Sequence, residues 1–163
     1  MTLTSHVTLD ALTSMHHSNA IILTPVATGT IVPPTDLGYP RVFSEMGAVS
    51  NNREANINTN RARLQHVYRS RLAQDYPLVF LIDSDVVVTR EDLDALIDNW
   101  NGRGTTACID TGNREGSSHI CCACCLLSGE DYLQVKYFDN VTACQCTKLP
   151  GPYYVDGLKG KEV

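Results

Sequence analysis

The segment PLVFLIDSDVVV, residues 77–88, constrains the fold more than any other part of the chain. A near-continuous apolar run without polar alternation is typical of a strand buried on both faces, as in a parallel sheet covered by helices. Asp83 and Asp85 follow this run directly. Ligands bind at the carboxyl ends of the strands in open sheets of this type. The sequence therefore places two acids where a ligand site is expected.

The rest of the chain alternates segments with strand and helix character. Short apolar runs predict strands over 20–26, 105–110, 119–127 and 152–156. Helical patterns cover 89–100 and 128–138, each beginning with a hydroxyl cap and early acids, and 41–76 in pieces broken near Asn51. This alternation predicts an α/β fold with a largely parallel sheet.

The bulk properties predict one domain over residues 19–163, preceded by a mobile or helical lead at 1–18. The net charge of −5 argues against nucleic acid as a partner, since nucleic-acid binding needs a basic face. No apolar run approaches the roughly 20 residues that span a bilayer. The N-terminus lacks the basic start and apolar block of a secretory signal, so we expect a cytoplasmic setting.

The paired acids indicate a cation. Two carboxylates this close raise each other's pKa unless a cation lies between them. Mg²⁺ and Mn²⁺ prefer carboxylate oxygens and are often shared with substrate phosphates. Acids near a helix N-terminus also occur as ordinary loop chemistry, but the apolar run before Asp83 and Asp85 favours a divalent-metal site.

Three segments together resemble a known enzyme family. AIILTPV at 20–26, an Arg- and Asn-rich helix, and PLVFLIDSDVVVTREDLDALI at 77–97 look like a GT-A fold glycosyltransferase of the family-2-like kind. The resemblance covers roughly residues 19–138. It implies a three-layer α/β/α fold with a mainly parallel sheet. It also implies sugar transfer from a nucleoside diphosphate sugar to an acceptor, with Mn²⁺ or Mg²⁺ as the cofactor.

The resemblance also implies roles for individual residues. The first strand would end near the nucleotide, and a basic residue on the next helix would lie near the base or diphosphate. Binding of the donor is implied for Thr24, Pro25, Val26, Arg61, Asp83 and Ser84, and binding of the metal for Asp83 and Asp85. The metal would act as a Lewis acid and neutralise charge on the departing nucleoside diphosphate.

An inverting enzyme of this kind also needs a carboxylate base for the acceptor hydroxyl. Relatives carry it late in the chain, in an acidic pair that opens a helix. Glu162 falls where that pair begins, and Asp156 is the second candidate. The chain ends at this point, so we expect a compact or C-terminally truncated domain. Glu130 and Asp131 are interpreted as acids that stabilise a helix N-terminus.

Two alternatives stay open. FLIDSDVV also approximates the first motif of HAD-class phosphatases, with Asp83 as the phosphorylated nucleophile and Asp85 as the acid/base. The other groups of such a site would come from Thr111, Lys136 or Lys148, and Asp156. The long segment before Asp83 disfavours this reading. The second alternative is a domain that binds a nucleotide sugar without catalysing transfer.

The seven cysteines include CCACC at 121–125 and CQC at 144–146. Closely spaced thiolates suit a structural zinc or an iron–sulfur cluster. Alternate side chains of a strand face opposite sides, however, and buried cysteine serves as a small hydrophobe, so the apolar context of CCACC favours packing over zinc. Loops at 27–40 and 111–118 are expected to shield the donor.

Overall fold

The computed structural model describes residues 5–10, 19–30, 36–100, 102, 105–107, 124–137 and 153–155. Within this part of the chain, seven strands form one sheet in the order β1-β3-β2-β4-β6-β5-β7. The strands are β1 (Ser5–Asp10), β2 (Ala20–Ala27), β3 (Arg41–Met46), β4 (Leu78–Ile82), β5 (Thr105–Ala107), β6 (Cys124–Ser128) and β7 (Tyr153–Val155). β1 and β6 run against the other strands, so the sheet is mixed and mostly parallel.

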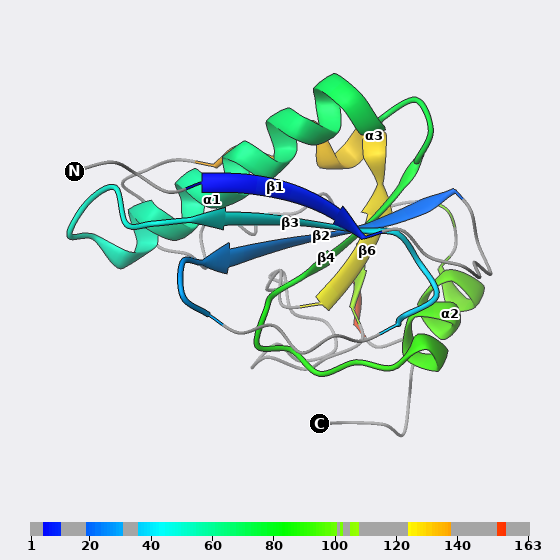
Figure 1. The fold of residues 1–163 in the computed structure, drawn as a ribbon. Coiled ribbons are helices and arrows are strands. Elements are labelled where there is room, and N and C mark those ends of the chain that lie inside the picture. Colours follow the sequence, from blue (N-terminus) through cyan, green and yellow to red (C-terminus); the bar gives the residue numbers. More distant parts are fainter. Residues whose placement is uncertain are drawn as a thin grey trace.

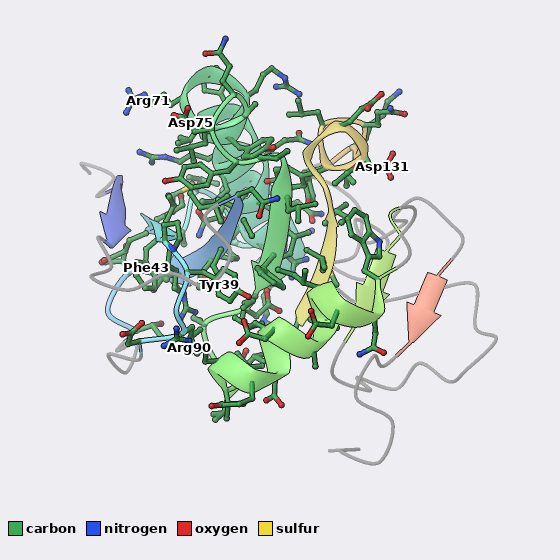
Figure 2. The ribbon with its side chains drawn as sticks, turned by 90° about the vertical axis from the view of Figure 1, so that its right-hand side faces the viewer. Tyr39, Phe43, Arg71, Asp75, Arg90 and Asp131 are labelled. Atoms are coloured by element: carbon green, nitrogen blue, oxygen red, sulfur yellow. The ribbon has the colours of Figure 1, made fainter. Side chains whose placement is uncertain are left out.

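Helices cover both faces of this sheet. Helix α1 (Arg53–Val67) continues into the π-helical turn η1 (Tyr68–Leu72), and the short α3 (Gly129–Tyr132) lies on the same side. Helix α2 (Arg90–Asn99) packs on the opposite face, as Figure 1 and the turned view in Figure 2 show. The α/β character expected from the sequence is confirmed.

The apolar runs of the central strands divide between two cores. On β2 and β4, odd-numbered side chains such as Leu23 and Leu81 pack under α1 and η1. Even-numbered side chains such as Ile22 and Phe80 pack against α2. Burial on both faces explains why PLVFLI lacks the polar alternation of a half-exposed strand.

The connection from β2 to β3 and the connection from β3 to β4 cross on opposite faces of the sheet. After β2 the chain enters β3, and Leu37 and Tyr39 from this connection pack in the core on the α2 side. The Tyr39 hydroxyl donates a hydrogen bond to Asp94 of α2. After β3 the chain crosses through α1 on the other face to β4, on the far side of β2. Such a reversal of strand order opens a crevice at the carboxyl ends of the strands.

Several predicted elements are confirmed. The strand before Asp83 is β4, and the helix predicted over 89–100 is α2. Thr89 and Asp92 form a reciprocal capping box at its start, in which each side chain accepts from the backbone of the other residue. The short strand predicted near the end of the chain contains β7.

Three predictions are wrong. Residues 5–10, expected in a mobile or helical lead, form β1, which pairs antiparallel with β3. Residues 41–46, expected to be helical, form β3, because neighbours on both sides satisfy its backbone hydrogen bonds. The helix expected over 128–138 is a single turn, α3, followed by irregular chain to residue 137.

Candidate functional site

A cleft of about 470 Å³ opens on the α1 face, at the carboxyl ends of β2, β3 and β4. The strands contribute small and apolar groups, and α1 contributes polar and charged groups. The residues that line the cleft include Pro25, Ala27, Thr30, Met46, Gly47, Ala48, Arg53, Asn56, Ile57, Asn60, Arg61, Asp83, Ser84 and Asp85. This volume lies in the range of small-molecule binding sites.

Helix α1 presents two different surfaces to the sheet. Residues three or four apart lie on one face of a helix. In the first half of α1 the inward stripe is largely polar, with Asn56, Asn60 and Arg61 at the cleft. Further along, the stripe turns apolar and continues as Leu64 and Tyr68 in the core. The same helix therefore forms a wall of the cleft and closes the core.

The alternation of side chains along β4 places Asp83 on the face of the sheet that α1 covers. Asp83 follows Leu81 by two residues, so it continues the side of β4 that faces α1. The Arg61 guanidinium reaches it from α1, with Nη2 at 3.2 Å from Oδ1 and 3.3 Å from Oδ2. The side chains are 11% and 29% exposed, so this ion pair lies at the floor of the cleft rather than on the open surface.

Burial dominates the electrostatics of Asp83. Removal from water raises the pKa of its carboxyl, the Arg61 guanidinium and its hydrogen bond lower it, and the Asp85 charge raises it slightly further. The net direction is upward, which means that Arg61 does not fully offset the cost of the buried charge. A further cation near Asp83 and Asp85 would stabilise the ionised form.

Two asparagines of α1 shape the cleft through contacts within the protein. The Asn60 Oδ1 atom accepts from the Ser44 hydroxyl at 2.6 Å, and its Nδ2 donates to the Val26 carbonyl at 3.2 Å. Asn56 Oδ1 accepts from the backbone N–H groups of Val49 and Ser50, at 2.9 and 3.0 Å. Asn60 thus ties α1 to β2 and β3, and Asn56 ties it to the loop after β3.

The structure brings together five of the residues singled out in the sequence. These are Pro25, Arg61, Asp83, Ser84 and Asp85, all of which line the cleft. The sequence did not single out Arg53, Asn56 or Asn60. The sequence feature that could have identified them is the unusual density of Arg and Asn in one helix. Asparagine is unfavourable in a helix interior, so several asparagines in one helix indicate that their side chains have partners elsewhere.

Thr24 and Val26 are not among the residues that line the cleft. β2 continues to Ala27, so the strand ends later than predicted. Thr24 is fully buried, and its hydroxyl accepts a hydrogen bond from Arg41 Nε at 3.0 Å. Val26 is also buried and contributes its carbonyl to Asn60.

The remaining predicted residues have other locations. Asp156 and Glu162, the candidate bases, lie outside the described residues, as do Thr111, Lys148 and the segment 111–118. Lys136 is exposed after α3 and does not line the cleft.

The carboxylates fit a cation that shares its ligands with a substrate. Among the residues that the structure describes, no group of three or more His, Cys, Asp or Glu could hold a metal. Asp83 and Asp85 alone cannot enclose one. Mg²⁺ typically takes one or two carboxylates and completes its shell with water and substrate phosphates, so this pair suits a metal–phosphate complex. Asp85, which is exposed, is the more accessible carboxylate.

Cys124 and Cys125 lie in β6 on opposite faces of the sheet. Cys125 packs in the core under α1 and Cys124 in the core against α2. Both are buried, and their side chains cannot meet at one metal ion. The other five cysteines lie outside the described residues.

Comparison with known proteins does not assign the chain to a family. No protein-family model matches it, and a search of curated proteins gives no significant match. In the part of the chain that the structure describes, no helix has the length and apolar character needed to cross a membrane.

Proposed function

We propose that the protein binds a nucleoside diphosphate sugar in the cleft, together with Mn²⁺ or Mg²⁺ at Asp85, and transfers the sugar to an acceptor. The observation that carries the proposal is the convergence of three distant segments. Pro25 from β2, Arg61 from α1 and the acids after β4 meet in one cleft at the carboxyl edge of the sheet. A GT-A fold, with helices on both faces of a mostly parallel sheet, is part of the proposal.

The transfer breaks the bond between the anomeric carbon and the diphosphate oxygen, and forms a bond from that carbon to the acceptor oxygen. A divalent cation would supply Lewis-acid stabilisation of the departing diphosphate. Asp85 would ligate the cation with the assistance of Asp83, which the hydrogen bonds from Arg61 hold in place. The proton of the acceptor hydroxyl passes to a carboxylate base, for which Asp156 and Glu162 remain candidates.

The contact between Arg61 and Asp83 favours this function over the phosphatase. A nucleophilic Asp83 would need an oxygen directed at the phosphorus of the substrate. Nη2 of Arg61 lies within 3.3 Å of both oxygens of Asp83, so the guanidinium engages the oxygens that would have to attack the phosphorus. This contact suits a carboxylate that shapes a binding site.

Binding of nucleoside diphosphates with and without Mn²⁺ tests the proposal. At a ligand concentration of about 100 Kd, binding stabilises the fold by about 2.7 kcal/mol, which raises the melting temperature of a chain this size by about 5–10 °C. We expect this shift with at least one of UDP, GDP, ADP or CDP, and only when Mn²⁺ or Mg²⁺ is present. Absence of a cation-dependent shift with all four would refute the proposal.

A matched pair of variants locates the cation. Asp85→Asn keeps the size of the side chain and removes its charge, and should weaken Mn²⁺-dependent nucleotide binding about 10-fold or more, equal to about 1.4 kcal/mol. Asp75→Asn removes an exposed acid in the turn after η1, does not alter the lining of the cleft, and should leave binding unchanged. Figure 2 shows that end of the helix. Equal losses in both variants would mean that only net charge matters.

Turnover separates the enzyme from a binding domain. Release of the nucleoside diphosphate from its sugar, measured with a panel of UDP- and GDP-sugars, is expected for the transferase even when water replaces the acceptor. Tight binding without any release would indicate a domain that only binds. Capture of beryllium fluoride on Asp83 would instead favour the phosphatase.

A further inference from the structure

We infer that the chain associates with itself in a head-to-tail arrangement, through a basic surface on α1 and η1 of one copy and an acidic surface on α2 of the next. The basic surface consists of Arg63, His66, Arg69 and Arg71, and the acidic surface of Glu91, Asp94 and Asp98. Neither surface lines the cleft, so the inference is independent of the proposed function. It follows from the distribution of charge along the two helices and over the two faces of the sheet.

The basic surface is formed by the second half of α1 and by η1. Residues 55–74 contain four arginines and no acid, although the chain as a whole has a net charge of −5. One of these arginines, Arg61, belongs to the cleft. Of the others, Arg69 and Arg71 are exposed and Arg63 is half-buried. Figure 2 shows Arg71 at the outer surface of the molecule. Positive charge is therefore concentrated on one helical segment of an acidic protein.

The acidic surface is formed by α2. Residues 91–98 contain four acids and no basic residue. Glu91, Asp94 and Asp98 are spaced by three and then four residues, so they lie along one stripe of the helix. Glu91 and Asp98, at the ends of the stripe, are exposed, and Asp94 between them accepts a hydrogen bond from the Tyr39 hydroxyl. α2 therefore presents a row of negative charge.

The two charged stretches have similar lengths. Arg63 and Arg71 are eight residues apart, and Glu91 and Asp98 seven. At a helical rise of 1.5 Å per residue, these separations span about 12 Å and about 10 Å along the helix axes. Packed helices lie about 8–10 Å apart, a distance at which long arginine side chains reach carboxylates on the facing helix. One α2 helix can therefore lie along the α1–η1 segment of another copy with opposite charges facing each other.

A second copy of the chain is the partner that this distribution favours, because the chain itself carries the complementary surface. A nucleic acid or an anionic membrane would present negative charge over a wide area, which the net negative charge of the protein repels. A second copy presents the row of acids on α2 directly to the arginines. Repulsion between the more distant charges of the two copies is screened beyond about 10 Å at about 0.1 M salt.

The positions of the two surfaces determine the kind of assembly. α1 and α2 cover opposite faces of the sheet, as Figure 1 shows. One contact therefore uses the basic surface of one copy and the acidic surface of the other, and a third copy can add at either end. The expected product is an open series of copies rather than a closed dimer. Exposed ion pairs each contribute little, so we expect weak association, with a Kd of about 10 µM to 1 mM.

Sedimentation equilibrium of the whole chain tests this association. In about 0.1 M NaCl, the average mass of the wild type should rise with protein concentration and pass that of a dimer. In about 1 M NaCl, where the screening length falls from about 10 Å to about 3 Å, the association should weaken about 10-fold or more. A wild type that stays monomeric in the lower salt at about 1 mM protein, or whose mass stops at the dimer, would overturn the inference.

Two charge-reversal variants test the contact itself. Arg69→Glu/Arg71→Glu gives a chain with two acidic surfaces, and Glu91→Lys/Asp98→Lys gives a chain with two basic ones. Each variant alone should stay monomeric, because like charges would face each other. An equimolar mixture of the two should associate, because each variant supplies the surface that the other lacks. All four side chains are exposed, and urea unfolding of each variant checks that it is folded.

Lys136→Glu is the control for net charge. It changes the charge in the same direction as the arginine variant, but Lys136 is exposed after α3 and belongs to neither surface. It should associate as the wild type does. Association that persists in either folded variant alone, or a mixture of folded variants that stays monomeric, would overturn the inference. A monomeric wild type that binds vesicles of anionic lipid would overturn it in favour of a membrane partner for the basic surface.

Discussion

Replacing Asn60 with alanine tests whether one buried side chain fixes α1 to the sheet at the cleft. The substitution removes the acceptor of the Ser44 hydroxyl and a donor to the Val26 carbonyl. Ser44 is 0% exposed and Val26 4%, so water cannot readily replace either contact. A buried polar group that loses its partner costs about 1–3 kcal/mol. Since the hydroxyl of Ser44 can rotate, we expect a total loss of about 2–4 kcal/mol.

Urea unfolding at pH 7 gives this loss directly as a change in midpoint at constant slope. Asn99→Ala is the control, because the exposed Asn99 amide only donates to the Ala95 carbonyl within α2, and it should change stability by no more than about 0.5 kcal/mol. In a double-mutant cycle, Asn60 and Ser44 should couple by about 0.5–3 kcal/mol. A loss below about 0.5 kcal/mol for Asn60→Ala would contradict the argument, since it is the value of an ordinary surface substitution.

Two further predictions concern Asp83 and Gly129. Burial raises the pKa of the Asp83 carboxyl, so its contribution to the free energy of unfolding is highest when protonated and falls as the pH rises through that pKa. Relative to the wild type, the stability of Asp83→Asn in urea unfolding should therefore increase as the pH rises above the ordinary carboxyl pKa of about 4; a relative stability that decreases instead would mean that Arg61 outweighs burial. A Cβ on Gly129 would lie 1.8 Å from the Tyr68 hydroxyl oxygen, which donates to the Tyr76 carbonyl. Gly129→Ala should cost about 1–3 kcal/mol, and Tyr68→Phe in the same background should recover part of it; a neutral Gly129→Ala would show that this packing is loose.

The elements that are best predicted from the sequence are those whose own residues show a clear pattern. The apolar run of β4 needs burial on both faces, and the cap and early acids of α2 mark its start. β3 lacks such a signal, because Ser44 and Glu45 interrupt its apolar residues. Ser44 can be buried there only because Asn60, from a helix later in the chain, accepts its hydrogen bond. Strand character at β3 is therefore a tertiary property.

The residues of the candidate site also fall into two groups: those that their own sequence context predicts and those that depend on tertiary contacts. Asp83 and Asp85 were predictable because they end an apolar strand, and Arg61 because the resemblance supplies a basic residue on the preceding helix. Asn56 and Asn60 were not, because their roles depend on the loop after β3 and on the ends of β2 and β3. Asparagine disfavours a helix by competing for its backbone hydrogen bonds. Several asparagines in one helix therefore indicate partners elsewhere in the fold.

The position of Asp83 supports the proposal that the cleft is a binding site. Its charge is unfavourable where it lies, since burial raises the pKa of its carboxyl despite the nearby Arg61 guanidinium. A neutral side chain of similar size would fit the same position without that cost. Residues that lower the stability of a fold are concentrated at functional sites, where a ligand supplies the missing interaction. A cation shared by Asp83, Asp85 and a bound diphosphate would do so, and would stabilise the ionised carboxylates in the nucleotide complex.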